Sequence, residues 1–340
     1  ASPFITFYLL FIAILLVANG CHQKTTNQGL DLVSTIESKA PSKITPKKEP
    51  FKGKPAVMYR SNDLGATWHP FAEGIPEDAT VSAIKPYGNK VYVATDYHGI
   101  FVISDRQASW VPLRIERFKD LDINCLEVEA DQLVIGTLRH GIIVSSDGGR
   151  NWQPAKQNME NSPIRAFIKS GNKLLAGTDA GIFESMDKGN TWTPSFGQMQ
   201  ILGFTSLNNQ IYAATQHGAL KYDRHTENWT AIYDGDALHD IGNDGRYIYA
   251  MTIGQQLLKT QNDGVLWENA QNGITYPVNY YTNELQHIDQ HIFSAQWIGI
   301  YYSANYGNSW RILDGGLPDS TAFSTLEITD LGIIAGISIR

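Results

Sequence analysis

Three arginines are the residues of this chain best suited to bind an anion: Arg117, Arg139 and Arg165. A guanidinium is planar and can bind a carboxylate through two parallel hydrogen bonds. Residues 55–340 carry 20 basic and 31 acidic residues, a net charge of −11. Within this acidic body the arginines predict a local positive site for an acidic side chain or an anionic sugar. Alternatively, each arginine pairs with a nearby acid such as Asp179 and only holds a loop.

Three histidines raise the question of a metal site. His98, His140 and His217 each precede a glycine in a recurring loop. Zinc ligands must converge to within about 2.1 Å of the ion, and these histidines belong to separate segments. We therefore expect repeated turn residues and no metal.

The composition excludes several other classes of protein. Two cysteines cannot supply a disulfide framework or a zinc site made of several thiolates. The chain has no phosphate-binding loop and no nucleophilic serine motif, so we expect no cofactor. A net charge of −7 for the whole chain gives no support to nucleic-acid binding.

Seven of the eight tryptophans recur at intervals of 37 to 43 residues: Trp68, Trp110, Trp152, Trp192, Trp229, Trp267 and Trp310. A period near 40 is typical of propeller blades or solenoid turns. Five of the segments that end at these tryptophans share the pattern Ser/Thr-x-Asp/Asn-x-Gly-x-x-Trp: SNDLGATW, SSDGGRNW, SMDKGNTW, TQNDGVLW and SANYGNSW. The copies at Trp110 and Trp229 depart from it.

This pattern resembles the Asp box, or BNR repeat, of sialidase-like β-propellers, and the chain is also similar to photosystem assembly-factor and sortilin-type propellers. In that family the box closes a hairpin between the third and fourth strands of a blade. The resemblance therefore implies structural roles for Asp63, Gly65, Trp68, Asp147, Gly149, Trp152, Asp187, Gly189, Trp192, Asn262, Gly264, Trp267, Asn305, Gly307 and Trp310. Glycine suits such turns because it tolerates a positive φ.

Short β-rich runs precede each box, as in VYVAT-DYHG-IFVIS and LVIGT-LRHG-IIVSS, and a further run precedes these. Each repeat thus predicts four antiparallel strands. The C-terminus supplies only the first two strands of a repeat and the folded N-terminus only the last two, so together they complete one blade. We predict an all-β fold: a single seven-bladed β-propeller over residues 55–340, closed by its terminal strands.

The resemblance also implies where a ligand would bind. The family's ligand face is formed by the loops between second and third strands and by the connections between blades. Projecting the repeats puts Asp96, Tyr97, His98, Arg139, His140, Asp179, His217 and Trp297 on such loops, with Arg117 and Arg165 in or near the connections.

A sialidase would need three arginines around a carboxylate, a Tyr–Glu pair and an acid–base Asp, and no Tyr–Glu pair is evident. Xyloglucanase-type enzymes resemble two facing propellers rather than one. We therefore predict a non-catalytic module that binds a protein or a glycan. The alternative is a carbohydrate-active enzyme, which a convergent carboxylate pair in one deep pocket would favour.

The N-terminal segment predicts where the protein resides. Residues 4–18 form an uninterrupted apolar run of 15 residues, too short for a typical membrane span of about 20 and typical of a signal peptide. The following Asn19, Gly20 and Cys21 resemble the lipobox of bacterial lipoproteins. Alternatively, the run is a plain secretory signal and the cysteine is incidental. We expect a signal peptide over 1–20, lipidation at Cys21 and a flexible linker over 21–54. This combination predicts a protein anchored in the bacterial cell envelope, at the outer membrane.

Overall fold

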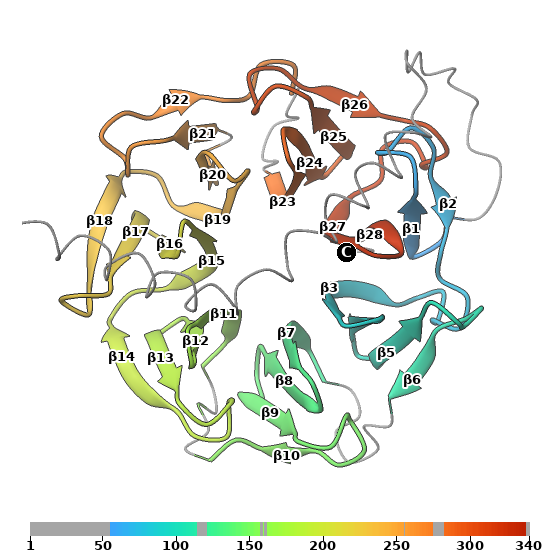
Figure 1. Ribbon diagram of the computed structural model, residues 1–340, viewed down its shortest axis with the longest axis horizontal. Helices are drawn as coiled ribbons and strands as arrows, with labels where there is room; N and C mark the ends of the chain where they lie inside the picture. The colour runs from blue at the N-terminus through green and yellow to red at the C-terminus, as the bar shows by residue number, and fades with distance from the viewer. Residues whose placement is uncertain are drawn as a thin grey trace, which may run out of the picture.

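A computed structural model describes residues 55–113, 121–156, 159, 162–254, 256–274 and 282–337. The signal peptide and linker predicted for residues 1–54, with Cys21, lie outside the described residues, as does Arg117. The described residues form 28 strands in seven four-stranded antiparallel sheets. Viewed down the short axis, the sheets form a ring of seven blades (Figure 1). The predicted fold class is confirmed.

The blades follow one another along the chain. The first contains β3 (Thr80–Tyr87), β4 (Lys90–Asp96), β5 (Gly99–Ser104) and β6 (Val111–Leu113). The second contains β7 (Ile123–Glu129), β8 (Gln132–Thr137), β9 (Ile142–Ser145) and β10 (Gln153–Pro154). The third contains β11 (Ile164–Ser170), β12 (Lys173–Thr178), β13 (Gly181–Ser185) and β14 (Thr193–Gly197).

The remaining three sequential blades repeat this order. The fourth contains β15 (Ile201–Leu207), β16 (Gln210–Thr215), β17 (Gly218–Asp223) and β18 (Asn228–Asp234). The fifth contains β19 (Leu238–Asn243), β20 (Ile248–Thr252), β21 (Leu257–Thr260) and β22 (Glu268–Asn269). The sixth contains β23 (Thr282–Ile288), β24 (His291–Gln296), β25 (Gly299–Ser303) and β26 (Arg311–Leu313).

The seventh blade is shared by the two ends of the folded body. It contains β1 (Met58–Ser61), β2 (His69–Pro70), β27 (Phe323–Thr329) and β28 (Gly332–Ile337), in the order β2-β1-β28-β27. Met58 lies opposite Gly336, and Ser61 lies opposite Ile333. Figure 1 shows the blue β1 beside the red β28. The pairing joins both ends of the ring, so neither β1 nor β28 is left as an open sheet edge.

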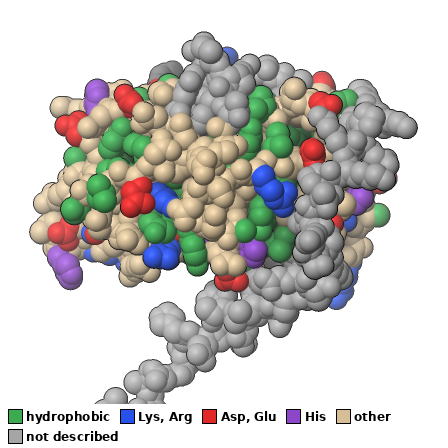
Figure 2. All heavy atoms as spheres, turned by 90° about the horizontal axis from the view of Figure 1, so that it is seen from above, with side chains coloured by type: hydrophobic (Ala, Val, Ile, Leu, Met, Phe, Trp, Pro, Cys, Tyr) green, Lys and Arg blue, Asp and Glu red, His purple; other side chains and the backbone are tan. Residues whose placement is uncertain are grey.

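Burial changes with a strand's position in its blade. The second strands are almost wholly buried, because they have sheet neighbours on both sides and further blades above and below. Their continuous apolar runs reflect that environment. The outermost strands are short and exposed, as in β2, β10 and β22. The part of the outer wall that Figure 2 shows carries hydrophobic, acidic and basic side chains in small mixed groups.

The hydrophobic core consists of layers between neighbouring blades. One layer combines Met58 and Ile334 of the seventh blade with Val81 and Val93 of the first. Another combines Tyr92 and Ile100 of the first blade with other side chains of the second. Because each layer needs both of its blades, the ring is stabilised as a unit.

Five turns between third and fourth strands contain the eight-residue repeat, and we call them the tryptophan turns: residues 61–68, 145–152, 185–192, 260–267 and 303–310. In the first turn the Asp63 carboxylate accepts hydrogen bonds from the Thr67 backbone N–H at 2.9 Å and from its hydroxyl at 2.6 Å. The Gly65 N–H donates to Ser61 Oγ at 2.9 Å. Asn262 and Asn305 accept the corresponding backbone bond in the last two turns.

The backbone of these turns needs two successive residues with positive φ. The glycine is the second of them, at +78° in Gly65 and +90° in Gly189, and Leu64 and Lys188 precede it at +53° and +59°. The sequence pattern identified the glycine but not the preceding residue. The strain of a side chain at positive φ is offset by the bonds that close each turn.

The tryptophan rings are fixed in two ways. Trp68, Trp152 and Trp192 donate their indole N–H to the glycine carbonyl of their own turn at 2.9–3.1 Å. Trp267 and Trp310 instead donate to carbonyls of the preceding blade, Ile232 and Ala270, at 3.1 and 2.6 Å. The first mode stabilises a turn, and the second ties neighbouring blades together.

The described residues contain no α-helix, so that part of the chain offers no helical span for a membrane.

Candidate binding face and central cavity

The turns between second and third strands lie at one face of the ring, which we call the turn face. Because strands alternate in direction, the tryptophan turns lie at the opposite face. The turn face contains most of the predicted ligand residues: Asp96, Tyr97 and His98 after β4, Arg139 and His140 after β8, Asp179 after β12, His217 after β16, and Trp297 after β24.

Buried threonines hold four of these turns in place. The hydroxyls of Thr95, Thr137, Thr178 and Thr215 donate to the carbonyl of the glycine that begins or directly precedes the third strand, at 2.7–3.0 Å. Each of the four threonines is at most 1% exposed. These bonds explain why Thr, a short loop and Gly recur in the sequence. They also make the turns a rigid base for exposed side chains.

Arg139 is both exposed and held in place. Its Nε donates to the Asp122 carboxylate at 2.5 Å, and its terminal nitrogen donates to the Tyr97 hydroxyl at 3.1 Å. His140 Nδ1 lies 3.3 Å from the same carboxylate. The Arg139 side chain is 64% exposed, whereas that of Asp122 is 3% exposed. The buried acid thus orients an arginine whose remaining N–H groups face solvent.

The charge on Asp122 is stabilised by these neighbours. Burial alone would raise the pKa of Asp122, but the hydrogen bonds from Arg139 and His140 outweigh burial and lower it. Asp122 is therefore ionised at neutral pH and remains the counterion of Arg139. Sequence reasoning missed Asp122, because nothing in the chain order indicates that it faces the next turn.

The other predicted ligand residues form separate pairs. Arg165 binds Asp179 through two hydrogen bonds of 2.8 and 3.1 Å, as the alternative interpretation expected. His98 lies 3.4 Å from Asp78, and His217 contacts Gln216. Arg139 and Arg165 thus bind different carboxylates, and the described residues do not join them in one anion site.

All seven innermost strands contain a β-bulge near the turn face. The pairing with the second strand skips one residue in each blade: Ser82, Asn124, Arg165, Leu202, His239, Asn283 and Ser324. Bulges re-aim side chains and are frequent beside functional sites. Here they surround the axis of the ring.

The bulge side chains also connect blades. Asn124 Nδ2 donates to the Ile164 and Arg165 carbonyls of the next blade, both at 3.0 Å. Asn283 Nδ2 donates to the Phe323 carbonyl at 2.7 Å. Ser324 Oγ donates to the Val81 carbonyl across the closure at 2.7 Å.

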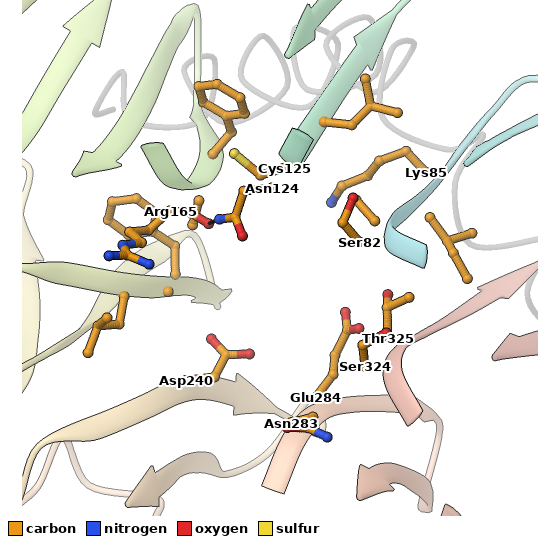
Figure 3. A pocket seen from close by; sticks show the side chains of 18 of the residues that line it. Ser82, Lys85, Asn124, Cys125, Arg165, Asp240, Asn283, Glu284, Ser324 and Thr325 are labelled. Carbon is orange, nitrogen blue, oxygen red and sulfur yellow. Dashed lines mark hydrogen bonds between the residues drawn. The ribbon is translucent and has the colours of Figure 1, made fainter. Parts of the chain in front are cut away.

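A central cavity of about 540 Å³ lies inside this ring of bulges and is lined by the innermost strands of all seven blades. Figure 3 shows Lys85, Asp240 and Glu284 directed into it from different sides. The position after the bulge is small in four blades: Ala83, Cys125, Ala166 and Gly203. In the neighbouring fifth and sixth blades the same position is Asp240 and Glu284.

These acids have unusual proton affinity. Burial raises the pKa of Asp240 well above its ordinary value, and the nearby Glu284 adds to the effect. Burial also raises the pKa of Glu284, and it raises that of Glu327 to about 8. Burial alone would lower the pKa of Lys85, but the surrounding carboxylates raise it. Among these acids, Glu327 therefore stays largely protonated at neutral pH, whereas Lys85 stays charged.

We expect the ring to lose stability between pH 7 and pH 8. Burial raises the pKa of Glu327 to about 8, so over this range the folded protein still binds a proton that the unfolded chain has released. The free energy of unfolding therefore falls as pH rises. Thermal unfolding at the two pH values checks this. Glu327→Gln should flatten this dependence of stability on pH, and the exposed outer-strand change Glu268→Gln should not. Equal slopes in all three proteins would contradict the prediction.

No protein-family model matches this chain, and no curated protein matches it. Solved structures do. YCF48 bound to D1 peptide is 14% identical with a TM-score of 0.62, over 87% of this chain and 99% of that one. The GH74 xyloglucanase from Xanthomonas campestris is 14% identical with a TM-score of 0.63, over 84% of this chain and 55% of the enzyme.

The extracellular domain of a one-component system from B. thetaiotaomicron is 15% identical with a TM-score of 0.62, over 78% of this chain and 38% of that one. This chain thus spans well under two thirds of the sensor domain and of the xyloglucanase. At such low identity these likenesses establish the seven-bladed β-propeller fold alone.

Proposed function

We propose that this protein is a non-catalytic binding module of the cell envelope, anchored through a lipid on Cys21, and that its turn face binds a polypeptide partner. The observation that carries the proposal is Arg139, which is exposed yet oriented by the buried Asp122 and by Tyr97. Arginine and tyrosine dominate the binding energy of many protein interfaces. Orienting them beforehand reduces the entropy lost on binding.

Other features of the turn face support this proposal. Tyr97 is 49% exposed and Ile253 is 47% exposed, both on turns between second and third strands. The resemblance to Asp-box propellers also implies a ligand at this face. One solved propeller of this fold is described as bound to a peptide, which favours a polypeptide over a glycan as partner.

A carbohydrate-active enzyme is the second candidate, because Asp240 and Glu284 line one cavity and both have raised pKa values. Glu284, however, accepts the Leu326 N–H at 2.8 Å and a bond from Thr325. It thereby ties the sixth blade to the seventh. A carboxylate used in this way is less available for proton transfer, so we favour binding. Hydrolysis of aryl glycosides or xyloglucan that Asp240→Asn abolishes would favour the enzyme.

Affinity capture of the detergent-solubilised protein tests the binding face. The protein with Tyr97→Ala and Arg139→Lys should lose a specific partner that the wild type retains, because it lacks the ring and the planar guanidinium but keeps a cation beside Asp122. The matched control carries Val265→Ser and Leu266→Ser on the opposite face and should retain it. Loss of the partner only in that control would place the site on the other face. A glycan array run in parallel tests the glycan alternative.

The anchor is tested separately. Cys21→Ser should move the protein from the membrane fraction to the soluble envelope fraction, because the lipidated thioether can no longer form. Cell fractionation with a high-salt wash measures this. A Cys21→Ser protein that stays in the membrane fraction after that wash contradicts the anchor without affecting the binding proposal.

A further inference from the structure

The bulge residues around the cavity use their hydrogen-bond donors elsewhere. The side-chain amide groups of Asn124 and Asn283 donate hydrogen bonds to backbone carbonyls of the next blade. The Ser324 hydroxyl donates to the Val81 carbonyl at 2.7 Å, and the Ser82 hydroxyl donates to the Ala94 carbonyl at 3.2 Å. The two serines and Asn124 thereby use all their donors, and Asn283 keeps one N–H, so the side-chain oxygens remain as acceptors. Those oxygens accept no hydrogen bond from the part of the chain that the structure describes.

The cavity therefore presents acceptors on several sides. Asn124, Asn283 and the two serines all line it, together with the carboxylates of Asp240 and Glu284. Figure 3 shows these side chains around one open space. An array of acceptors is satisfied by a group that carries several N–H donors and no acceptor, which among side chains means an ammonium or a guanidinium.

Asp240 is accommodated by a specific feature of the neighbouring blade. A Cβ atom added at Gly203 would overlap the Asp240 carboxylate. The missing side chain at position 203 thus leaves room for an acid where four other blades have a small residue. Besides the backbone N–H of Ile241 at 2.8 Å, the Asp240 carboxylate has no hydrogen-bond donor and no ion pair among the described residues.

Lys85 is the main positive charge near Asp240, and several acids share it. Its titratable and charged neighbours come from six innermost strands: Lys85, Cys125, Arg165, His239, Glu284 and Glu327. Arg165 is neutralised by Asp179, and burial lowers the pKa of His239 to about 4, so this imidazole is uncharged near neutral pH. Lys85 is shared among Glu327, Glu127, Glu284 and Asp240, and it forms no ion pair with Asp240 among the described residues.

We propose that the central cavity is a subsite for a cationic side chain, an arginine or a lysine, which the polypeptide partner inserts along the axis of the ring. Asp240, Glu284 and the acceptor oxygens of Asn124 and Asn283 receive its N–H groups. This inference rests on the proposed binding function and specifies the chemistry of the partner. A cavity of about 540 Å³ is large enough for such a side chain.

Binding is coupled to loss of a proton. A carboxylic acid must ionise before it can pair with the cation, and burial, which raises the pKa of Asp240 well above its ordinary value, makes that ionisation more costly. A guanidinium stays charged throughout this range. The affinity for an arginine side chain therefore rises with pH. It levels off once Asp240 is already ionised in the unbound protein.

The test uses the full chain and a capped tripeptide, acetyl-Gly-Arg-Gly-amide, with its neutral citrulline counterpart as control. Ligand-observed NMR at pH 6.5 and 8.0 should detect millimolar or tighter binding of the arginine peptide, stronger at pH 8.0. The citrulline peptide should bind at least about tenfold more weakly. Equal binding of both peptides, or none by the wild type at either pH, would overturn the proposal.

Two variants separate binding from stability. Asp240→Asn removes a poorly hydrated acid, so it should raise the thermal midpoint of unfolding. It should also weaken binding of the arginine peptide at least about tenfold. Gly203→Ala keeps every charge but displaces the carboxylate, and it should also weaken binding. Glu268→Gln makes the same acid-to-amide change on the outer wall. It should alter neither the thermal midpoint nor the affinity for the arginine peptide. If the captured partner is retained by Asp240→Asn with full affinity, the cavity subsite is wrong and the turn-face proposal still stands.

Discussion

A chain that ends at Asp330 is expected to lose cooperative folding. It lacks β28, which lies between β1 and β27 in the shared blade. Three isoleucines buried in that strand, Ile333, Ile334 and Ile337, contribute about 1.5–3 kcal/mol each. Their sum is comparable with the whole net stability of a typical domain, about 5–15 kcal/mol. Two unpaired strand edges add to the loss.

Near-ultraviolet circular dichroism and thermal unfolding measure this effect. A chain that ends at Ile337 keeps all of β28 and serves as the control. The shorter chain should lack a sharp transition, whereas the control should unfold like the full chain. A cooperative transition of the shorter chain close to that of the control would show that the ring does not depend on its shared blade.

Trp192→Ala is expected to destabilise the ring by about 3–5 kcal/mol because it leaves a cavity. The ring of Trp192 is 3% exposed and stacks on Phe167 with 5.9 Å between centroids. Its N–H donates to Gly189, so Trp192→Phe should cost clearly less than Trp192→Ala. Urea denaturation gives these differences, and equal costs for the two changes would contradict the packing argument.

Asp187→Ala removes hydrogen bonds of the same turn. Asp187 accepts bonds from Ser185 and Thr191, but the turn is exposed. The cost is therefore at the lower end of the range for a lost hydrogen bond, about 1 kcal/mol. Neither this change nor the tryptophan variants should alter the affinity of the folded protein for its partner. They should lower only the fraction of protein that is folded.

The sequence was sufficient to predict the ring and its closure, because each depends on local signals that recur. A tight turn needs glycine with positive φ, and a buried second strand needs an apolar run, so both recur in most repeats regardless of tertiary detail. The last two strand-forming runs could be matched to the first two because the repeat has a fixed order. The same logic put Tyr97 and Arg139 on second-to-third strand turns.

The pairings within the site could not be predicted in the same way. Whether Arg139 meets Asp122 or Asp179 depends on how far neighbouring blades are rotated, and chain order does not specify that rotation. The bulges are also absent from any local pattern, so the side chains at Asn124 and Asn283 could not be assigned to the cavity. One signal was present: aligning the innermost strands shows acids at 240 and 284 where other blades have Ala, Cys or Gly.

Site-specific photo-crosslinking in the cells that make the protein tests directly whether the turn face binds a polypeptide partner. A photoreactive residue replaces Tyr97 on the turn face or Val265 on the face of the tryptophan turns. Val265 is the more exposed of the two, 86% against 49%, so random collisions would favour position 265. We expect a discrete protein adduct at position 97 and none at 265. Adducts at 265 alone, or at neither position, would contradict binding at the turn face.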